Sequence, residues 1–192
     1  MDHRHDVAID LARIYYTLSP QGLEQLTSIL VPMRFDKGEI IIHEGEVDKY
    51  MYFIHKGFIR QYYFKNGKDL TEHLSFENDL VVNIESFYRQ EPGVLFVEAM
   101  ESSILYGIPF DKITALSEES CELGIFYRKI LERSLIISQH KANILRFEKA
   151  PDRYLLYKKE QPEAFRRAPL NTIASLLQMT PETLSRVRAK DL

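Results

Sequence analysis

Apolar residues near the start of the chain follow a helical spacing. Residues 6–18 are weakly amphipathic, and residues 21–30 carry leucines three and four positions apart behind Ser19-Pro20, a pair that favours a helix start. Pro32 then ends the helical pattern. These residues predict two short helices that pack against the domain that follows, with no chemistry of their own.

From about residue 33 to residue 110, apolar residues alternate with polar ones instead. The runs are rich in Ile, Val, Tyr and Phe, and glycines separate them. Asn66-Gly67 stands between two aromatic-rich runs, which is a strong signal for a two-residue β-hairpin. Many short strands at regular spacing predict an antiparallel sandwich or jelly roll.

A helical spacing returns over residues 118–149, which contain no proline and one glycine. Two apolar stripes about 100° apart run along this predicted helix. They consist of Phe126, Ile130, Ile137, Ile144 and Phe147, and of Tyr127, Leu131, Leu135, Ala142 and Leu145. One stripe is enough to dock on the β domain, and the second predicts a parallel helix pair in a homodimer. The alternative is one broad face buried within a monomer.

Two short helices around a tight turn are predicted over residues 170–191, beyond a break at residues 150–152. The residues that face each other across the turn are Ile173, Ala174, Leu177, Leu184 and Val187. Thr180 and Pro181 favour a helix start there, and a left-handed Gln178 in the turn would cost about 1 kcal/mol. The polar groups left outside form a short basic helix of the kind that fits a major groove.

Composition and charge narrow the class of protein. The single cysteine, Cys121, excludes a disulfide framework and favours a reducing compartment. Without a long apolar run or a signal peptide, we expect a cytoplasmic protein with no membrane partner. The net charge is −3, but residues 151–192 hold eight Lys and Arg against five Asp and Glu. The positive field therefore lies on the C-terminal segment, where nucleic acid would bind.

The runs IASLLQMTPETLSRVR and KGEIIIHEGEVDKYMYFIHKGFIRQYY resemble the Crp/Fnr family of bacterial transcription regulators, in the manner of its Bacteroidetes-type members. The resemblance covers nearly the whole chain and implies an α+β fold with a cyclic-nucleotide-binding-like double-stranded β-helix. Residues 1–117 would form the effector-sensing domain, 118–149 the dimerisation helix and 150–192 the helix-turn-helix domain. Winged-helix relatives carry a β-hairpin wing, and poor strand character here predicts a reduced or missing wing.

The resemblance also implies partners and contact residues. Double-stranded DNA, a second copy of the chain and RNA polymerase are the implied partners. Glu182 falls at an acidic position that accepts from cytosine, and Arg186 at an arginine that reads guanine. The residues assigned to phosphates are Thr172, Thr180, Thr183, Ser185, Arg188 and Lys190. Arg166 and Arg167 are expected to replace some contacts of the wing.

Relatives that bind a cyclic nucleotide use a Gly-Glu pair and an Arg-Ser or Arg-Thr pair, and neither occurs between residues 75 and 106. The Arg-Ser position falls near Gly93-Val94, and this stretch holds one basic residue against six acidic ones. A phosphate needs donors and positive charge, so we do not expect cyclic AMP to bind in the usual way. A pocket for an unknown small-molecule effector is expected around Asn83, Glu85, Ser86 and Arg89, with a filled roll as the equal alternative.

Two other classes of protein stay open. One is a small-molecule sensor that acts mainly through protein contacts. The other is a cupin-type metal enzyme, but His43, His55 and His73 form no His-x-His pair, so we expect no metal and no cofactor. One cysteine is also too few for the iron–sulfur cluster of the oxygen-sensing branch of the resembled family. Nothing resembles a nucleophile–base arrangement or a phosphate loop, so no enzyme activity is expected.

Overall fold

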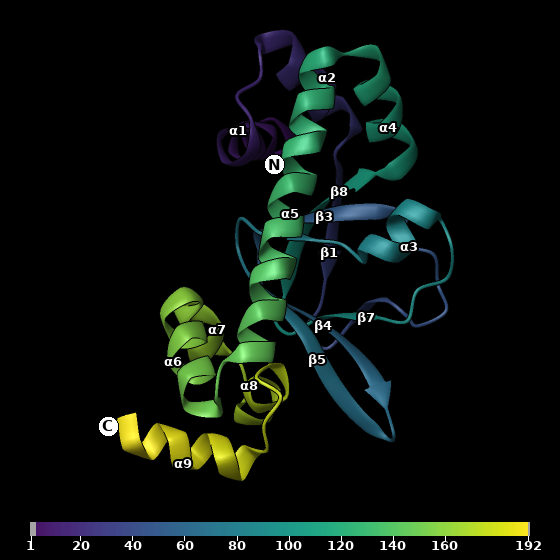
Figure 1. The fold of residues 1–192 in the computed structure, drawn as a ribbon. Coiled ribbons are helices and arrows are strands. Elements are labelled where there is room, and N and C mark those ends of the chain that lie inside the picture. Colours follow the sequence, from purple (N-terminus) through teal and green to yellow (C-terminus); the bar gives the residue numbers. More distant parts are fainter. Residues whose placement is uncertain (1–2, 192) are drawn as a thin grey trace.

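Within residues 3–191, the part of the chain that the computed structural model describes, eight strands form two four-stranded antiparallel sheets. The sheet with the order β1-β8-β3-β6 contains β1 (Val31–Phe35), β8 (Ser103–Pro109), β3 (Tyr50–Lys56) and β6 (Leu80–Val81). The sheet with the order β2-β7-β4-β5 contains β2 (Ile40–Ile42), β7 (Phe96–Ala99), β4 (Ile59–Lys65) and β5 (Lys68–Ser75). The expectation of an antiparallel roll with flanking helices is confirmed (Figure 1).

The central strand β3 is buried on both faces because its alternate residues belong to different clusters. Tyr52 and Ile54 pack between the two sheets. Met51 and Phe53 pack on the opposite face, under the helices. The strand therefore joins the interior of the roll to the helices at its end.

The β4–β5 hairpin turns at Asn66-Gly67, as the sequence predicts. Both residues have positive φ, 52° and 72°, which is the requirement of the tight type I′ turn that suits hairpins. Lys65 pairs with Lys68 at the end of the ladder. The hairpin projects from the roll towards the end of the molecule that carries the C-terminal helices (Figure 1).

Helices α1 (Arg4–Tyr15), α2 (Pro20–Ile29) and α4 (Phe110–Glu119) cover the other end of the roll (Figure 1). Ser19 caps α2 by accepting a hydrogen bond from the Gly22 N–H at 3.1 Å. Helix α4 was not expected from the sequence. Residues 118 and 119 belong to it, so the expected boundary of the long helix at residue 118 is wrong by three residues.

The long helix α5 runs from Cys121 to Phe147. Its cap is Ser120, whose side chain accepts from the Leu123 N–H at 3.4 Å. The helix ends at an extended Glu148, and α6 (Ala150–Glu160) begins with Pro151 in its first turn. The break therefore lies at residues 148–149, before the expected position, because proline is well tolerated in a first helical turn.

The first apolar stripe of α5 contains both buried and exposed residues, and the second contains an exposed leucine. Phe126 and Ile130 of the first stripe are buried against the roll, as expected. Ile137 is half-exposed because it lines hollows between α5 and the roll, and Phe147 is 71% exposed. In the second stripe Leu135 is 62% exposed. The middle of α5 therefore presents apolar side chains that this chain leaves uncovered.

After α5 the described chain consists of helices and the turns between them, with no strand that could form a wing up to residue 191. The helices are α6, α7 (Pro162–Arg167), α8 (Leu170–Leu176) and α9 (Pro181–Asp191). Helix α7 was not expected, and Pro162 stands at its start. Among the described residues, no helix has both the length and the apolarity needed to cross a bilayer.

Candidate nucleic-acid interface

A tight left-handed turn joins α8 to α9. Gln178 has φ 52°, as the sequence predicts for this position. Its N–H donates to the Ser175 carbonyl, and the Met179 N–H donates to the Ala174 carbonyl, both at 3.0 Å. These bonds satisfy the last carbonyls of α8 and direct the chain across it. The hydrogen bonds offset the strain of a non-glycine residue in this region.

The apolar residues on the facing sides of α8 and α9 form the core of this domain. Ala174, Leu177 and Leu184 are fully buried, and Val187 is partly buried beside them. Tyr154 and Tyr157 of α6 belong to the same cluster. The small Ala174 lies at the crossing and lets the two helices approach closely. The predicted helix-turn-helix core is confirmed in its packing.

Thr180 holds the start of α9. Its Oγ1 accepts a hydrogen bond from the Thr183 N–H at 3.2 Å, and its carbonyl accepts from the Leu184 N–H at 3.0 Å. The Thr180 and Thr183 hydroxyls are also 3.2 Å apart. Thr180 is therefore an N-cap, and its exposed hydroxyl is already engaged within the protein.

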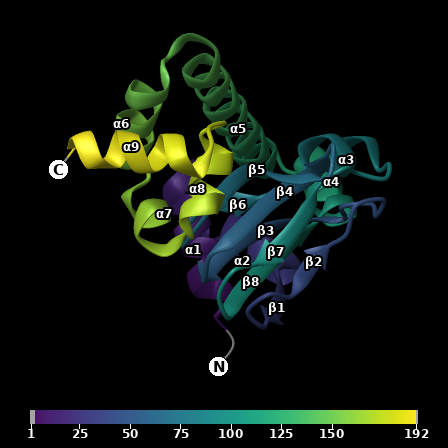
Figure 2. The ribbon, with the colours of Figure 1, turned by 90° about the horizontal axis from the view of Figure 1, so that it is seen from below.

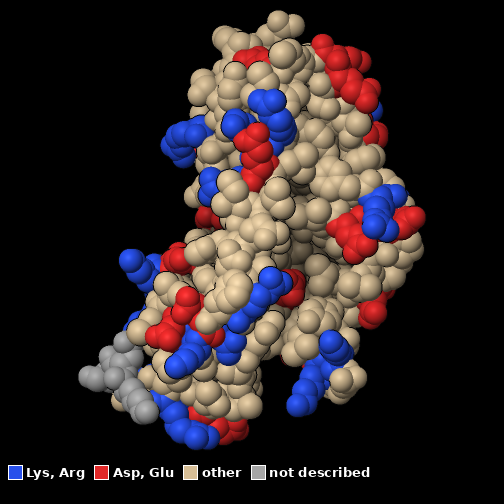
Figure 3. Space-filling model, in the orientation of Figure 1, with Lys and Arg blue, Asp and Glu red and all other residues tan. Residues whose placement is uncertain are grey.

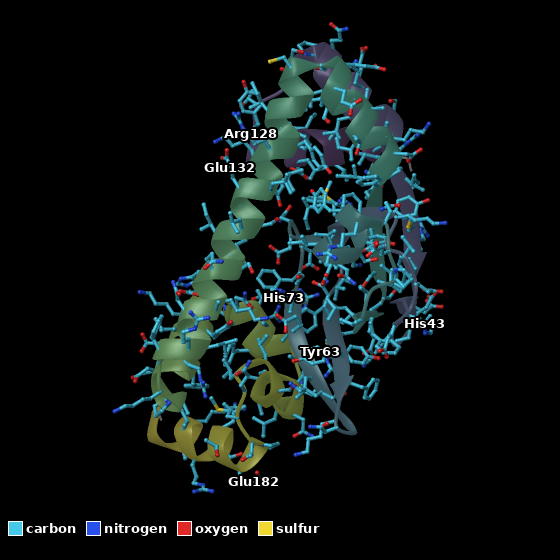
Figure 4. The ribbon with its side chains drawn as sticks, turned by 45° about the vertical axis from the view of Figure 1, so that its right-hand side comes forward. His43, Tyr63, His73, Arg128, Glu132 and Glu182 are labelled. Atoms are coloured by element: carbon cyan, nitrogen blue, oxygen red, sulfur yellow. The ribbon has the colours of Figure 1, made fainter. Side chains whose placement is uncertain are left out.

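The outer face of α9 is polar and exposed. Glu182, Ser185, Arg186 and Arg188 are exposed, and Glu182 lies at the lower edge of the molecule, away from the roll (Figure 4). A hydrogen bond with Thr180 is the main cause of the lowered pKa of Glu182, and Arg186 one turn later also contributes. The carboxylate and the guanidinium are thus presented together. The side chain of Lys190 lies outside the described residues.

Thr172 is only 7% exposed within α8. Its assignment to a phosphate does not fit this placement, because a buried hydroxyl offers little surface to a ligand. Thr172 occupies the inner face beside Ile173, where the tertiary packing of the small domain covers it. The exposed residue at this helix start is Asn171.

Arg167 is fully engaged within the protein. Its Nη1 donates to Glu77 Oε2 at 2.6 Å, and its Nη2 donates to Glu101 Oε2 at 2.8 Å. The guanidinium also lies 5.1 Å from the ring centroid of Phe58. The expectation that Arg167 replaces a wing contact is therefore wrong: it joins the C-terminal domain to the roll. Arg166 pairs with Glu163 at the surface.

The residues expected to frame an effector pocket belong to the start and the end of one short helix. Asn83 and Ser86 are buried at the start of α3 (Ile84–Arg89). They hold the segment at Asp48: Asp48 Oδ2 accepts from the Asn83 N–H at 3.0 Å, and Ser86 Oγ accepts from the Asp48 N–H at 2.9 Å. Glu85 and Arg89 are exposed and pair with each other at 3.6 Å. Two of the four side chains are therefore engaged within the roll and two are at the surface, and the expected effector pocket stays a prediction.

Gly93 closes this region further. A Cβ built on Gly93 would lie 2.1 Å from Asn83 Nδ2 and 3.0 Å from Ser86 Cβ. The Gly93 N–H donates to the Glu46 carbonyl at 2.9 Å, and its carbonyl accepts from Gly45 at 2.8 Å. A side chain at Gly93 would therefore require the Asn83 side chain to move.

Hollows lie instead between the roll and the middle of α5. One of about 330 Å³ and one of about 150 Å³ share the side chains of His73, Asp79, Arg133 and Ile137. Burial raises the pKa of Asp79 and lowers that of His73 to about 4. His73 lies on the side of the roll that faces α5 (Figure 4). Sequence reasoning missed Arg133, although an arginine between two apolar stripes was a signal for a polar lining.

The three histidines of the roll have separate environments. The His43 ring packs against Phe96, and the His55 ring packs against Tyr106. His73 Nε2 lies 3.9 Å from Glu72 Oε1. Among residues 3–191 no three His, Cys, Asp or Glu side chains gather closely enough to hold a metal ion. This arrangement offers no metal centre of the cupin type.

The chain thus combines a β-roll, a long helix and a helix-turn-helix. Residues 32–120 match the family model described as the cyclic nucleotide-binding domain. No curated protein matches the chain in sequence.

Solved structures of the same fold extend the comparison to the C-terminal helices. FixK2 from Bradyrhizobium japonicum has a TM-score of 0.71 at 16% identity over 84% of each chain. The catabolite activator protein of Thermus thermophilus has a TM-score of 0.58 at 20% identity, over 94% of this chain and 85% of its own. A protein from Eubacterium rectale described as a Crp/Fnr family regulator has a TM-score of 0.66 at 16% identity, over 90% and 83%. The resemblance to the Crp/Fnr family is confirmed: this chain has the fold of its regulators, with a cyclic nucleotide-binding-family roll.

Proposed function

We propose that the protein is a transcription regulator of the Crp/Fnr type that binds double-stranded DNA through α9. The observation that carries the proposal is the exposed polar face of α9 over a fully packed helix-turn-helix core. Glu182 and Arg186 stand one turn apart on this face, and their groups match cytosine and guanine edges respectively. Ser185 and Arg188 flank them and suit phosphate oxygens.

Two copies are part of the proposal because one short helix makes few base contacts. Leu131, Leu135, Ala142 and Leu145 follow spacings of four, seven and three along α5, which suit the seam of a parallel helix pair. Leu135 is uncovered in the single chain. A two-fold pair would place two α9 helices on successive major grooves of a palindromic site.

We propose that the small-molecule effector of this protein is not cyclic AMP bound in the usual way. Gly93 stands where relatives carry the Arg of the phosphate-binding pair, and the exposed Arg89 nearby is already paired with Glu85. The hollows beside Arg133 and Asp79 are where an unknown small molecule would reach α5. The proposed output is contact with RNA polymerase once the dimer is on its site.

Selection of bound duplexes from a random pool tests the proposal. The purified protein should enrich a two-fold symmetric sequence, and the same selection with added metabolite extract should reveal an effector as a change in yield. Failure to enrich any sequence under both conditions would contradict DNA reading. That result would favour a sensor that acts through protein contacts.

A further inference from the structure

The tip of the β4–β5 hairpin carries two lysines with no acidic partner. Lys65 and Lys68 are exposed and directly opposite each other in the ladder. Among residues 3–191 neither ammonium group has a carboxylate within salt-bridge distance, because the adjacent Asp69 pairs with Arg60 at 3.1 Å. Like charges directly opposite on neighbouring strands destabilise a hairpin. The two lysines are therefore placed where their charges repel each other.

Hydrogen bonds fix the hairpin to the helix-turn-helix. The Thr71 N–H of β5 donates to Ser175 Oγ of α8 at 2.8 Å. The Ser175 hydroxyl in turn donates to the Asp69 carbonyl at 3.4 Å. Helix α8 lies against β5 in the view from below (Figure 2). The lysines therefore hold a fixed position relative to α9.

The hairpin tip and the start of α9 line one groove. This groove has a volume of about 810 Å³, with Lys65 and Lys68 on one wall and Asn171, Thr180 and Pro181 on the other. Basic side chains stand on both sides of a hollow at the lower end of the molecule (Figure 3). The wall opposite the lysines includes the starts of both helices of the motif.

We propose that Lys65 and Lys68 contact the phosphate backbone of the DNA on which α9 lies. This inference rests on the proposed function and adds a second contact surface, supplied by the roll. Unpaired ammonium groups beside a groove of this size complement a backbone that carries one negative charge per about 1.7 Å of helix axis. Such contacts add affinity without choosing a sequence.

The test compares the salt dependence of DNA binding for the wild type and K65Q/K68Q on a selected duplex. Each phosphate contact contributes about 0.9 to the slope of log K against log salt. K65Q/K68Q removes two lysines from each of two subunits, so its slope should be less steep by about 3.6. The preferred sequence should stay the same. R13Q/K112Q is the control, because it removes the same charge from α1 and α4 at the opposite end of the molecule (Figure 1).

The outcomes separate the inference from the proposed function. If K65Q/K68Q keeps the slope of the wild type and of R13Q/K112Q, the hairpin does not touch DNA and only this inference fails. If the wild type binds no duplex, both fail. Thermal unfolding checks the fold of each variant, and K65Q/K68Q should be at least as stable as the wild type because a like-charge pair is removed.

Discussion

Arg186 and Glu182 are the two charged side chains of α9 that we propose to contact DNA bases. Both are exposed, one turn apart, on a helix whose opposite face is held by the buried Leu184. Neither side chain has a role in packing. Substitution at these positions should therefore change DNA recognition with little effect on stability.

Arg186→Ala should lose about 1–3 kcal/mol on the selected sequence and relax the choice at one base pair, because a bidentate contact to guanine would be lost. The measurement is competitive binding with duplexes changed at each position in turn. Arg188→Ala is the matched control and should weaken all duplexes by the same factor. Uniform weakening by Arg186→Ala would make it a phosphate contact instead.

Gln178 carries backbone strain in the turn between α8 and α9. The φ of Gln178 is 52°, a value that glycine adopts without a steric penalty. Glycine also loses more chain entropy on folding, which offsets part of this gain. Gln178→Gly should therefore stabilise the protein by about 0.5–1 kcal/mol. Thermal unfolding measures the gain. Gln178→Ala should give none, since alanine keeps its Cβ. Equal stability of all three proteins would show that the turn is unstrained.

For single residues, the sequence predicts the features that depend on neighbours in the chain. The left-handed Gln178 and the Thr180 cap depend on neighbouring residues, and both were predicted. The burial of Thr172, Asn83 and Ser86 was not predicted, because it depends on residues far away in the chain, such as Asp48 for Asn83. Polar residues at helix starts look alike in sequence whether they face solvent or the core.

Helix α5 is the element that would join two copies. Its ends pack on the roll and on the C-terminal domain through Phe126 and Ile144, while Leu135 is uncovered at its middle. A leucine buried at a helix pair contributes about 1.5–3 kcal/mol. An interface with two-fold symmetry buries it twice.

Leu135→Asp should convert the dimer to monomers, with a dissociation constant raised about 100-fold or more. Sedimentation equilibrium measures the change, and Asn143→Asp, on an exposed position of the same helix away from the leucine stripe, should leave the proposed dimer intact. If Leu135→Asp sediments as the wild type does, α5 does not form the interface.

Elements with a clear period were predicted, and two helices without one were not. The strands, the hairpin and α5 follow regular spacings, and their existence was correct. Helices α4 and α7 were missed, because α4 follows a strand directly at Pro109 and α7 has only six residues. Short helices depend on tertiary contacts more than on their own pattern.

In the whole molecule, Arg167 links the C-terminal domain to the roll. Hydrogen bonds with Glu101 and Glu77 raise the pKa of Arg167. The hydrogen bond from Arg167 is the main cause of the lowered pKa of Glu101. For Glu77, burial acts in the opposite direction, but the bonds from Arg167 and Gly57 outweigh it and lower the pKa. The link therefore requires both carboxylates to be ionised.

Acid should loosen this link. Because docking lowers the pKa of Glu77 and Glu101 below the ordinary value of 4.5, their contribution is complete above that value and is lost as the pH falls through the lowered ones. Protease cleavage at the junction of residues 148–149 should rise over this range in the wild type. Arg167→Gln should already be cleaved faster at neutral pH and should show less change with acid, and a matching wild-type and variant profile would contradict the link.

The docking of the C-terminal domain on the roll could not be predicted from the sequence. Arg167 was read as a free cation because its partners lie 90 and 66 residues away. Ser175 and Thr71 are likewise 104 residues apart. Contacts at such separations leave no periodic pattern, whereas the division into a roll, a long helix and a helix-turn-helix does.

The central claim is that two coupled copies read a symmetric DNA site. The most direct measurement is titration of the selected palindrome and of a duplex with one half-site scrambled, recording both affinity and the number of chains bound. We expect two chains on the palindrome and an affinity at least about 1,000-fold above that for unrelated duplex, with a large loss when one half-site is scrambled. One chain per duplex, or equal affinity for the palindrome and the scrambled site, would contradict the account.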